Sequence, residues 1–146
     1  MVKAGTRILV LCTGNSCRSQ MTEGLLRHYG GESLDVSSAG LEPKGLNPHA
    51  VRVMTEIGID ISRQVSEHIQ KYAAESFDYV ITVCDSAAER CPVFPGNAIR
   101  LHWPFEDPAR ISGTEEDILE VFRGVRDKIG RKVQQWIAEV QLAHKR

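Results

Sequence analysis

The chain has no long hydrophobic segment, no excess of charge of one sign, and few cysteines. Near its start it carries only five clearly apolar residues in a row, at positions 8–12, too few for a signal-peptide core or a transmembrane helix. Its net charge is −1, with both signs mixed along the chain, which argues against a nucleic-acid or membrane partner. We therefore expect a cytoplasmic protein.

The four cysteines are Cys12, Cys17, Cys84 and Cys91. In a reducing compartment such residues are reactive or metal-binding more often than they are structural disulfides. Their spacings, C-x4-C and C-x6-C, differ from the paired C-x2-C pattern of zinc sites, and no pair of histidines lies near them. The sequence therefore favours reactive thiols.

The length of 146 residues and the 42% of apolar residues predict a single domain, residues 1–146, with one core. Strands are expected at residues 7–11, 34–38, 78–83 and 98–102. Helices are expected at residues 19–29, at 48–57 with Asn47 as cap, in a short piece from Ser66 through 72, and in a long final helix opened by Thr114. The alternation indicates an α/β fold.

We predict an open, four-stranded parallel sheet of order 2-1-3-4 with helices on both faces. In such sheets, ligands bind beyond the carboxyl ends of the strands. Cys12 ends the first strand and Cys84 follows the third, so this fold brings both thiols to one edge.

The loop after the first strand predicts an oxyanion site. Its length allows the backbone to curl around a tetrahedral anion, with amide groups facing inward and the next helix adding its positive end. In that setting the pKa of Cys12 would fall to ~3.5–7.5, which makes it a nucleophile. The alternative is that Cys12 is a small buried core residue. The proposed binding loop comprises Thr13, Gly14, Asn15, Ser16, Cys17, Arg18 and Ser19.

Two further segments fit the same edge. Cys84 and Cys91 flank a helix-compatible segment that Pro92 ends, and with Cys12 they suggest a relay by thiol–disulfide exchange. The alternative is that Cys84 packs under the third strand and Cys91 is incidental. After the fourth strand, Asp107 could donate a proton to a leaving oxygen, with Glu106 as the other candidate; an Asp-Pro pair is also an ordinary turn signal.

These motifs resemble one known family along nearly the whole chain. Residues 12–19 resemble the phosphate-binding loop of the low-molecular-weight protein tyrosine phosphatase fold. With residues 20–24, 37–40 and 102–109, they resemble the thioredoxin-coupled arsenate reductases built on that fold. Two features separate these reductases from the phosphatases: the Cys84 and Cys91 pair, and Ala109, where phosphatases usually have an aromatic residue.

The resemblance implies that Cys12 attacks arsenate while Arg18 and the loop amides hold its oxygens. Ser19 would stabilise the thiolate, and Asp107 would protonate the leaving hydroxyl. Cys84 would then release arsenite by forming a disulfide with Cys12, and Cys91 would take over that disulfide. Thioredoxin would reduce it, with glutaredoxin and glutathione as the alternative reductants.

No tightly bound cofactor is implied, but some members of the family bind a potassium ion. The matching positions are Asn15, Glu23, Ser38 and Glu67, where Glu67 replaces the usual aspartate. Phosphate and sulfate are expected to bind as analogues of arsenate, and we expect a monomer. The alternatives are a low-molecular-weight phosphatase acting on phosphotyrosine and a non-catalytic oxyanion-binding module.

Overall fold

The computed structural model describes residues 5–144 and contains a four-stranded parallel sheet in the order β2-β1-β3-β4. The strands are β1 (Thr6–Cys12), β2 (Leu34–Gly40), β3 (Tyr79–Thr82) and β4 (Ile99–His102). The predicted order is confirmed. β1 and β2 extend further than expected because they remain paired up to Cys12 and Gly40, so the strand itself carries Cys12 to the edge of the sheet.

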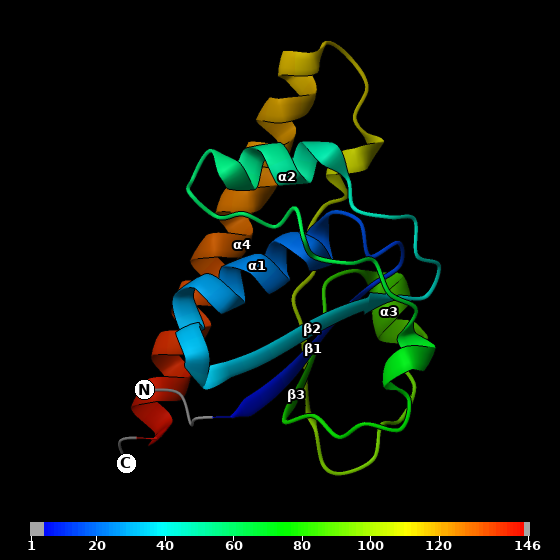
Figure 1. Cartoon of the computed structure of the whole chain (residues 1–146), viewed down its shortest axis with the longest axis vertical. Helices are drawn as coiled ribbons and strands as arrows, with labels where there is room; N and C mark the ends of the chain where they lie inside the picture. Colours follow the sequence, from blue (N-terminus) through cyan, green and yellow to red (C-terminus); the bar gives the residue numbers. More distant parts are fainter. Residues whose placement is uncertain (1–4, 145–146) are drawn as a thin grey trace.

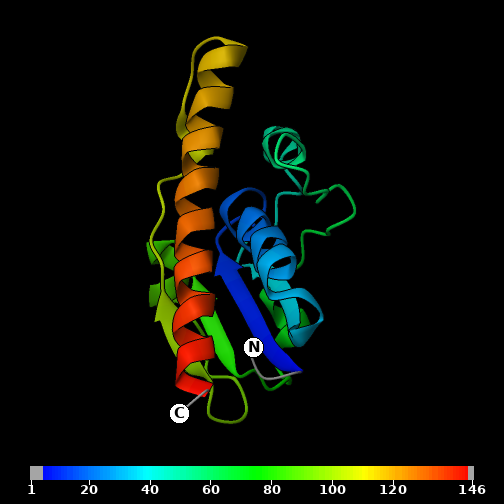
Figure 2. The same ribbon diagram turned by 90° about the vertical axis from the view of Figure 1, so that its left-hand side faces the viewer.

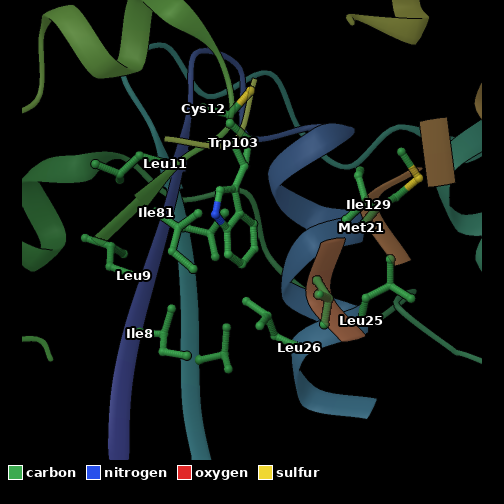
Figure 3. Close-up of a cluster of buried hydrophobic side chains, with 14 of the residues drawn as sticks. Ile8, Leu9, Leu11, Cys12, Met21, Leu25, Leu26, Ile81, Trp103 and Ile129 are labelled. Atoms are coloured by element: carbon green, nitrogen blue, oxygen red, sulfur yellow. The ribbon is translucent and has the colours of Figure 1, made fainter. Parts of the chain in front are cut away.

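Strand β1 is buried on both faces. Ile8 and Val10 lie on one face and Leu9 and Leu11 on the other, since successive side chains of a strand alternate, and all four are at most 1% exposed. Figure 3 shows Leu9 and Leu11 on the side of β1 away from α1. A central strand with two buried faces requires a covering layer on each side of the sheet.

Helices α1 (Arg18–Gly30) and α4 (Glu115–His144) pack against each other and form one covering layer. Figure 2 shows α4 running along the sheet, with its start projecting beyond it. As expected, Thr114 caps this helix: its hydroxyl accepts the Asp117 N–H at 3.1 Å, and Asp117 accepts the Thr114 N–H at 3.2 Å. The predicted core residues Phe122 and Trp136 are buried. Among residues 5–144, no helix combines the length and apolarity of a membrane span.

The opposite face is covered by aromatic residues and short helices. Phe77 stacks edge-on against Tyr72 and Phe94, and the Arg7 guanidinium lies 4.7 Å from the centre of the Phe77 ring. Tyr72 ends the 3-10 helix η2 (Ile69–Tyr72). The prediction of a helix capped by Ser66 is wrong here, because His68 is the cap: its Nδ1 accepts the Gln70 N–H at 3.0 Å.

The remaining short elements connect the strands and the long helices. Helix α2 (Pro48–Thr55) starts as expected, since Asn47 accepts the His49 N–H at 2.8 Å, but it ends two residues before the predicted end at residue 57. Arg126 of α4 donates to the Val53 carbonyl at 2.8 Å and joins α2 to α4. The other elements are α3 (Asp85–Glu89), η1 (Gly31–Ser33) and η3 (Pro108–Arg110). Helix α3 contacts β1 and β3, and Figure 1 shows it on the side of the molecule toward which the strands run.

Alanine substitutions at two helical glycines should change the stability of the protein in opposite directions. A Cβ at Gly24 of α1 would lie 2.6 Å from Ile61 Cγ2 and 3.2 Å from Met54 Cε, whereas one at Gly124 of α4 would meet nothing within 4 Å. For Gly24→Ala, overpacking of ~1–3 kcal/mol outweighs the ~1 kcal/mol gain in helix propensity, so unfolding in urea should require less denaturant. For the matched control, Gly124→Ala, only the gain remains, and the unfolding midpoint should rise. A higher midpoint for Gly24→Ala would contradict the tight contact.

Candidate active site

The loop from Cys12 to Arg18 turns its carbonyl groups outward. Each carbonyl oxygen from Cys12 to Ser16 accepts a hydrogen bond. The donors are Leu41 N to Cys12 at 3.3 Å, Glu42 N to Thr13 at 2.8 Å, Lys44 N to Gly14 at 2.9 Å, Gln20 Nε2 to Asn15 at 3.0 Å and Asn47 N to Ser16 at 3.0 Å. The N–H and C=O groups of a trans peptide point in opposite directions. The loop amides therefore face the inner side of the curve, as the sequence predicts for an oxyanion site.

A cavity of about 440 Å³ lies on this inner side. It is lined by Cys12, Thr13, Gly14, Ser16, Cys17, Arg18, Lys44, Ser86, Asp107, Ala109 and Arg110. Most of the predicted binding loop thus reaches one cavity together with Asp107. Figure 3 shows Cys12 at the top of the core, above Trp103 and Ile81.

Asn15 and Ser19 belong to the predicted loop but do not line the cavity. Both are fully buried, and Asn15 Nδ2 donates to Ser19 Oγ at 2.8 Å and to Ser38 Oγ at 2.9 Å. Asn15 Oδ1 accepts the Glu67 N–H at 2.8 Å. Asn15 also has a left-handed backbone, with φ of 46°, which asparagine tolerates better than most residues. The Asn15 side chain therefore fixes the loop from behind.

Gly40 is required by the closeness of this loop to β2. A Cβ at this position would lie 2.6 Å from the Thr13 carbonyl oxygen and 2.9 Å from the Asn15 nitrogen. Both are backbone atoms, which cannot move without opening the loop.

The Cys12 and Cys84 thiols are close enough that the pKa of each depends on the other, and Thr13 Oγ1 lies 3.3 Å from Cys84 Sγ. The neighbouring Cys84 thiol, together with burial, raises the pKa of Cys12, while Cys12 and then Thr13 lower the pKa of Cys84 to about 5. The prediction of a lowered pKa for Cys12 is therefore wrong for this arrangement. The two thiols share one proton and one negative charge, and moving that proton from Cys12 to Cys84 makes Cys12 the thiolate without a second ionisation.

The other two thiols are separate from this pair. Cys17 lines the cavity and is buried, which raises its pKa to about 11. Cys91 lies beyond α3 and is half-buried; its pKa is raised by burial, and Arg100 acts in the opposite direction. All four cysteines are free thiols.

Arg18 joins the loop to the Asp107 segment. Its guanidinium donates to the Phe105 carbonyl at 3.1 Å and lies 3.8 Å from the Asp107 carboxylate. Asp107 also accepts the Ala109 N–H at 3.0 Å and has the Arg110 guanidinium at 3.7 Å. An oxyanion in the cavity would compete with Asp107 for the Arg18 guanidinium. The Asp107 carboxyl would then face the anion.

Glu106, the alternative proton donor, does not line the cavity. Its exposed carboxylate pairs with Lys128 of α4 at 3.3 Å. The geometry therefore favours Asp107. The sequence analysis missed three lining residues, Lys44, Ser86 and Arg110. Ser86 lies within the segment between Cys84 and Cys91, and Arg110 directly follows residues 102–109, so their positions were the available signal; Lys44 had none.

The four positions matched to a potassium site lie together but satisfy one another. Ser38 Oγ accepts from Asn15 and donates to Glu23 Oε1 at 2.6 Å. Cations of this chain neutralise both carboxylates: Arg27 pairs with Glu23 at 3.0 Å, and Lys71 pairs with Glu67 at 3.1 Å. This arrangement does not fit a potassium ion.

Comparison with known proteins gives consistent results. The family model described as low molecular weight phosphotyrosine protein phosphatase matches residues 7–146. An arsenate reductase of Halalkalibacterium halodurans is 52% identical over 127 residues, covering 87% of this chain and 91% of that protein. A solved arsenate reductase in the phosphate binding state has a TM-score of 0.74 at 36% identity, covering 92% of this chain and 98% of that one. A thioredoxin-dependent arsenate reductase of Corynebacterium glutamicum has a TM-score of 0.72 at 27% identity, covering 98% of this chain and 65% of that one.

The shared proton predicts a specific thiol titration. The ultraviolet absorbance of thiolate should rise by one thiol near pH 5, where Cys84 loses its proton, so the pair is neutral below this pH and carries one charge above it. Cys84→Ser should remove this step, and the control Cys91→Ser should retain it. A step near pH 5 that persists in Cys84→Ser would instead assign the acidic thiol to Cys12.

Proposed function

This chain belongs to the low molecular weight phosphotyrosine protein phosphatase family, and we propose that within this family it reduces arsenate to arsenite. The observation that carries the proposal is the second thiol, Cys84, which lies beside Cys12 of the oxyanion cavity and contacts Thr13 of the same loop. Hydrolysis of a phosphate ester needs one nucleophilic thiol at this place, whereas a two-electron reduction needs a second thiol that can attack the first. The curated arsenate reductase at 52% identity agrees with this function.

In the first step, the Cys12 thiolate attacks arsenic and displaces one oxygen. The inward amides and Arg18 hold the remaining oxygens, and Asp107 supplies the proton with which the oxygen departs as water. The product is a covalent adduct between Cys12 sulfur and arsenic(V). No electrons have yet moved from sulfur to arsenic.

In the second step, Cys84 releases to solvent the proton that it held during the first step, and its thiolate attacks the sulfur of Cys12. A sulfur–sulfur bond forms, and the sulfur–arsenic bond breaks with its electron pair passing to arsenic. Arsenic leaves as arsenite, reduced by two electrons, and the two thiols are oxidised to a Cys12–Cys84 disulfide. The bond that Thr13 makes to Cys84 supports this step, because it favours the thiolate of the attacking residue.

In the third step, Cys91 attacks Cys84, and Cys12 leaves as a thiolate ready for another substrate. Helix α3 lies between the two reacting cysteines. Seven residues at a helical rise of ~1.5 Å would place them about 10 Å apart along the axis, whereas a disulfide needs Cα atoms within about 7 Å. α3 must therefore unwind for this exchange, which costs little for so short a helix.

Thioredoxin is the proposed reductant of the Cys84–Cys91 disulfide. Cys91 is the most exposed of the four cysteines, so a disulfide there is the one that a partner protein reaches most easily. Glutaredoxin with glutathione would perform the same two-electron reduction and is the alternative. The test is arsenate-dependent oxidation of NADPH with thioredoxin and thioredoxin reductase, run beside a glutaredoxin and glutathione mixture. Oxidation in neither mixture would contradict the proposed activity.

Three single substitutions separate the roles of the thiols. Cys12→Ser should abolish both arsenate reduction and hydrolysis of p-nitrophenyl phosphate, since both begin with the same nucleophile. Cys84→Ser and Cys91→Ser should abolish sustained reduction and spare the weak hydrolysis, which needs neither residue. Arsenite analysis and nitrophenol release measure the two activities. Sustained turnover of arsenate by Cys84→Ser would show that the relay is assigned wrongly.

Removing the proton donor should slow the first step alone. For Asp107→Asn we expect the rate of adduct formation to fall by ~10²–10⁴-fold, the usual loss for a general acid. Sulfate binding, measured by calorimetry, should be kept because Arg18 and the amides remain. Glu106→Gln is the matched control and should behave like the unaltered protein. If only the Glu106 variant is slow, the donor is Glu106.

A further inference from the structure

A histidine outside the oxyanion cavity spans the two residues that flank the Cys84 segment. His102 is the last residue of β4 and pairs in register with Thr82, the last residue of β3. Its Nδ1 lies 2.8 Å from Thr82 Oγ1, and its Nε2 lies 3.1 Å from Asp85 Oδ1. Asp85 is the first residue of α3. Only Val83 and Cys84 separate its two partners in the chain.

Both contacts can be made by a neutral imidazole. With the proton on Nε2, the ring donates to Asp85 and accepts the Thr82 hydroxyl at Nδ1. The backbone next to His102 is also held in place. The following residue, Trp103, is buried, and its backbone N–H donates to the Thr82 carbonyl at 2.8 Å. His102 therefore links a rigid part of the sheet to the start of a short helix.

Besides the contact of its sulfur with Thr13, Cys84 is placed by the residues on either side of it, and His102 links these two sides. The Cys84 side chain makes no capping bond to α3, and a five-residue helix is marginal by itself. Attack on the Cys12 sulfur requires Cys84 to be held at the correct distance and angle, and a misplacement of ~1 Å can cost ~10²-fold in rate.

We propose that His102 is a positioning residue for the redox relay, acting through Asp85 and Thr82 to hold Cys84 against Cys12. The proposal rests on the function proposed above. It also gives the link two opposite effects. Holding the start of α3 in place assists the attack of Cys84 on Cys12, but opposes the unwinding of α3 that the attack of Cys91 on Cys84 requires.

The test measures the two exchange steps separately. In a Cys91→Ser background the reaction stops at the Cys12–Cys84 disulfide, so arsenite release in a single turnover reports the first exchange. His102→Ala should lower this rate by about 10- to 100-fold. His102→Gln should restore most of it, since its amide can still donate to Asp85 and accept from Thr82. Asp85→Ala should resemble His102→Ala, and His28→Ala, at an exposed histidine on α1, is the matched control.

The second exchange is followed with all four cysteines present, by trapping free thiols at timed intervals and mapping the disulfides. Here His102→Ala should convert the Cys12–Cys84 disulfide, once it has formed, into the Cys84–Cys91 disulfide faster than the unaltered protein does. Hydrolysis of p-nitrophenyl phosphate should keep its kcat and KM, because neither His102 nor Asp85 lines the oxyanion cavity. A merely destabilised variant would instead lose hydrolysis and slow both exchanges.

Equal rates of the first exchange in His102→Ala and its parent would overturn the proposal, as would failure of His102→Gln to restore the rate when hydrolysis is intact. If the parent protein releases no arsenite, the proposed function fails, and the positioning role is decided by oxidation with diamide. Diamide takes two electrons and two protons from the thiols and so forms the Cys12–Cys84 disulfide without arsenate. By this route His102→Ala must again be slower than its parent, and His102→Gln must again restore most of the rate.

Discussion

The site depends on the outward direction of the carbonyl groups between Cys12 and Ser16. Each of these oxygens accepts a hydrogen bond from another part of the chain, mostly from residues 41–47. Because these bonds are made before any ligand arrives, the loop amides need no reorganisation to meet an oxyanion. The cost of the strained turn at Asn15 is offset by three hydrogen bonds to its side chain in a fully buried place. Gly40 and Asn15 therefore matter as much as the residues that line the cavity.

The paired thiols follow from the topology of the sheet. β1 and β3 are neighbours, and their carboxyl ends bring Cys12 and Cys84 into contact. Two thiolates at this distance would repel each other in a buried site, so the pair keeps one proton. The single charge first serves as nucleophile at Cys12 toward an oxyanion. Once Cys12 is bound to arsenic, Cys84 loses the shared proton, which its lowered pKa favours, and becomes the second nucleophile.

The sequence predicts the sheet order and the cavity because both depend on local patterns: apolar runs, loop length and the handedness of parallel connections. It fails where a residue's partner lies far along the chain. Asn15 has the pattern of a binding-loop residue, but bonds to Ser38 and Glu67 turn its side chain away from the cavity. The predicted pKa of Cys12 is wrong for the same reason, since it treats Cys12 without its distant neighbour Cys84. His68 replaces Ser66 as a cap because Ser66 lies 3.4 Å from the Gly14 carbonyl and 3.2 Å from the Gly45 N–H instead.

Rigidity and mobility are divided between the two sides of this site. The side that holds the anion is built on β1 and on the 13-residue helix α1, both buried in the core. The side that carries Cys84 and Cys91 is built on the five-residue helix α3, in which only Ala87 is buried. An element with few buried contacts opens at low cost in free energy. A relay in which one sulfur must reach first Cys12 and then Cys91 needs such an element, and it also needs a contact that holds the element in place until the first exchange is complete. His102 is placed to provide that contact, because it reaches the first residue of α3 from the end of the sheet.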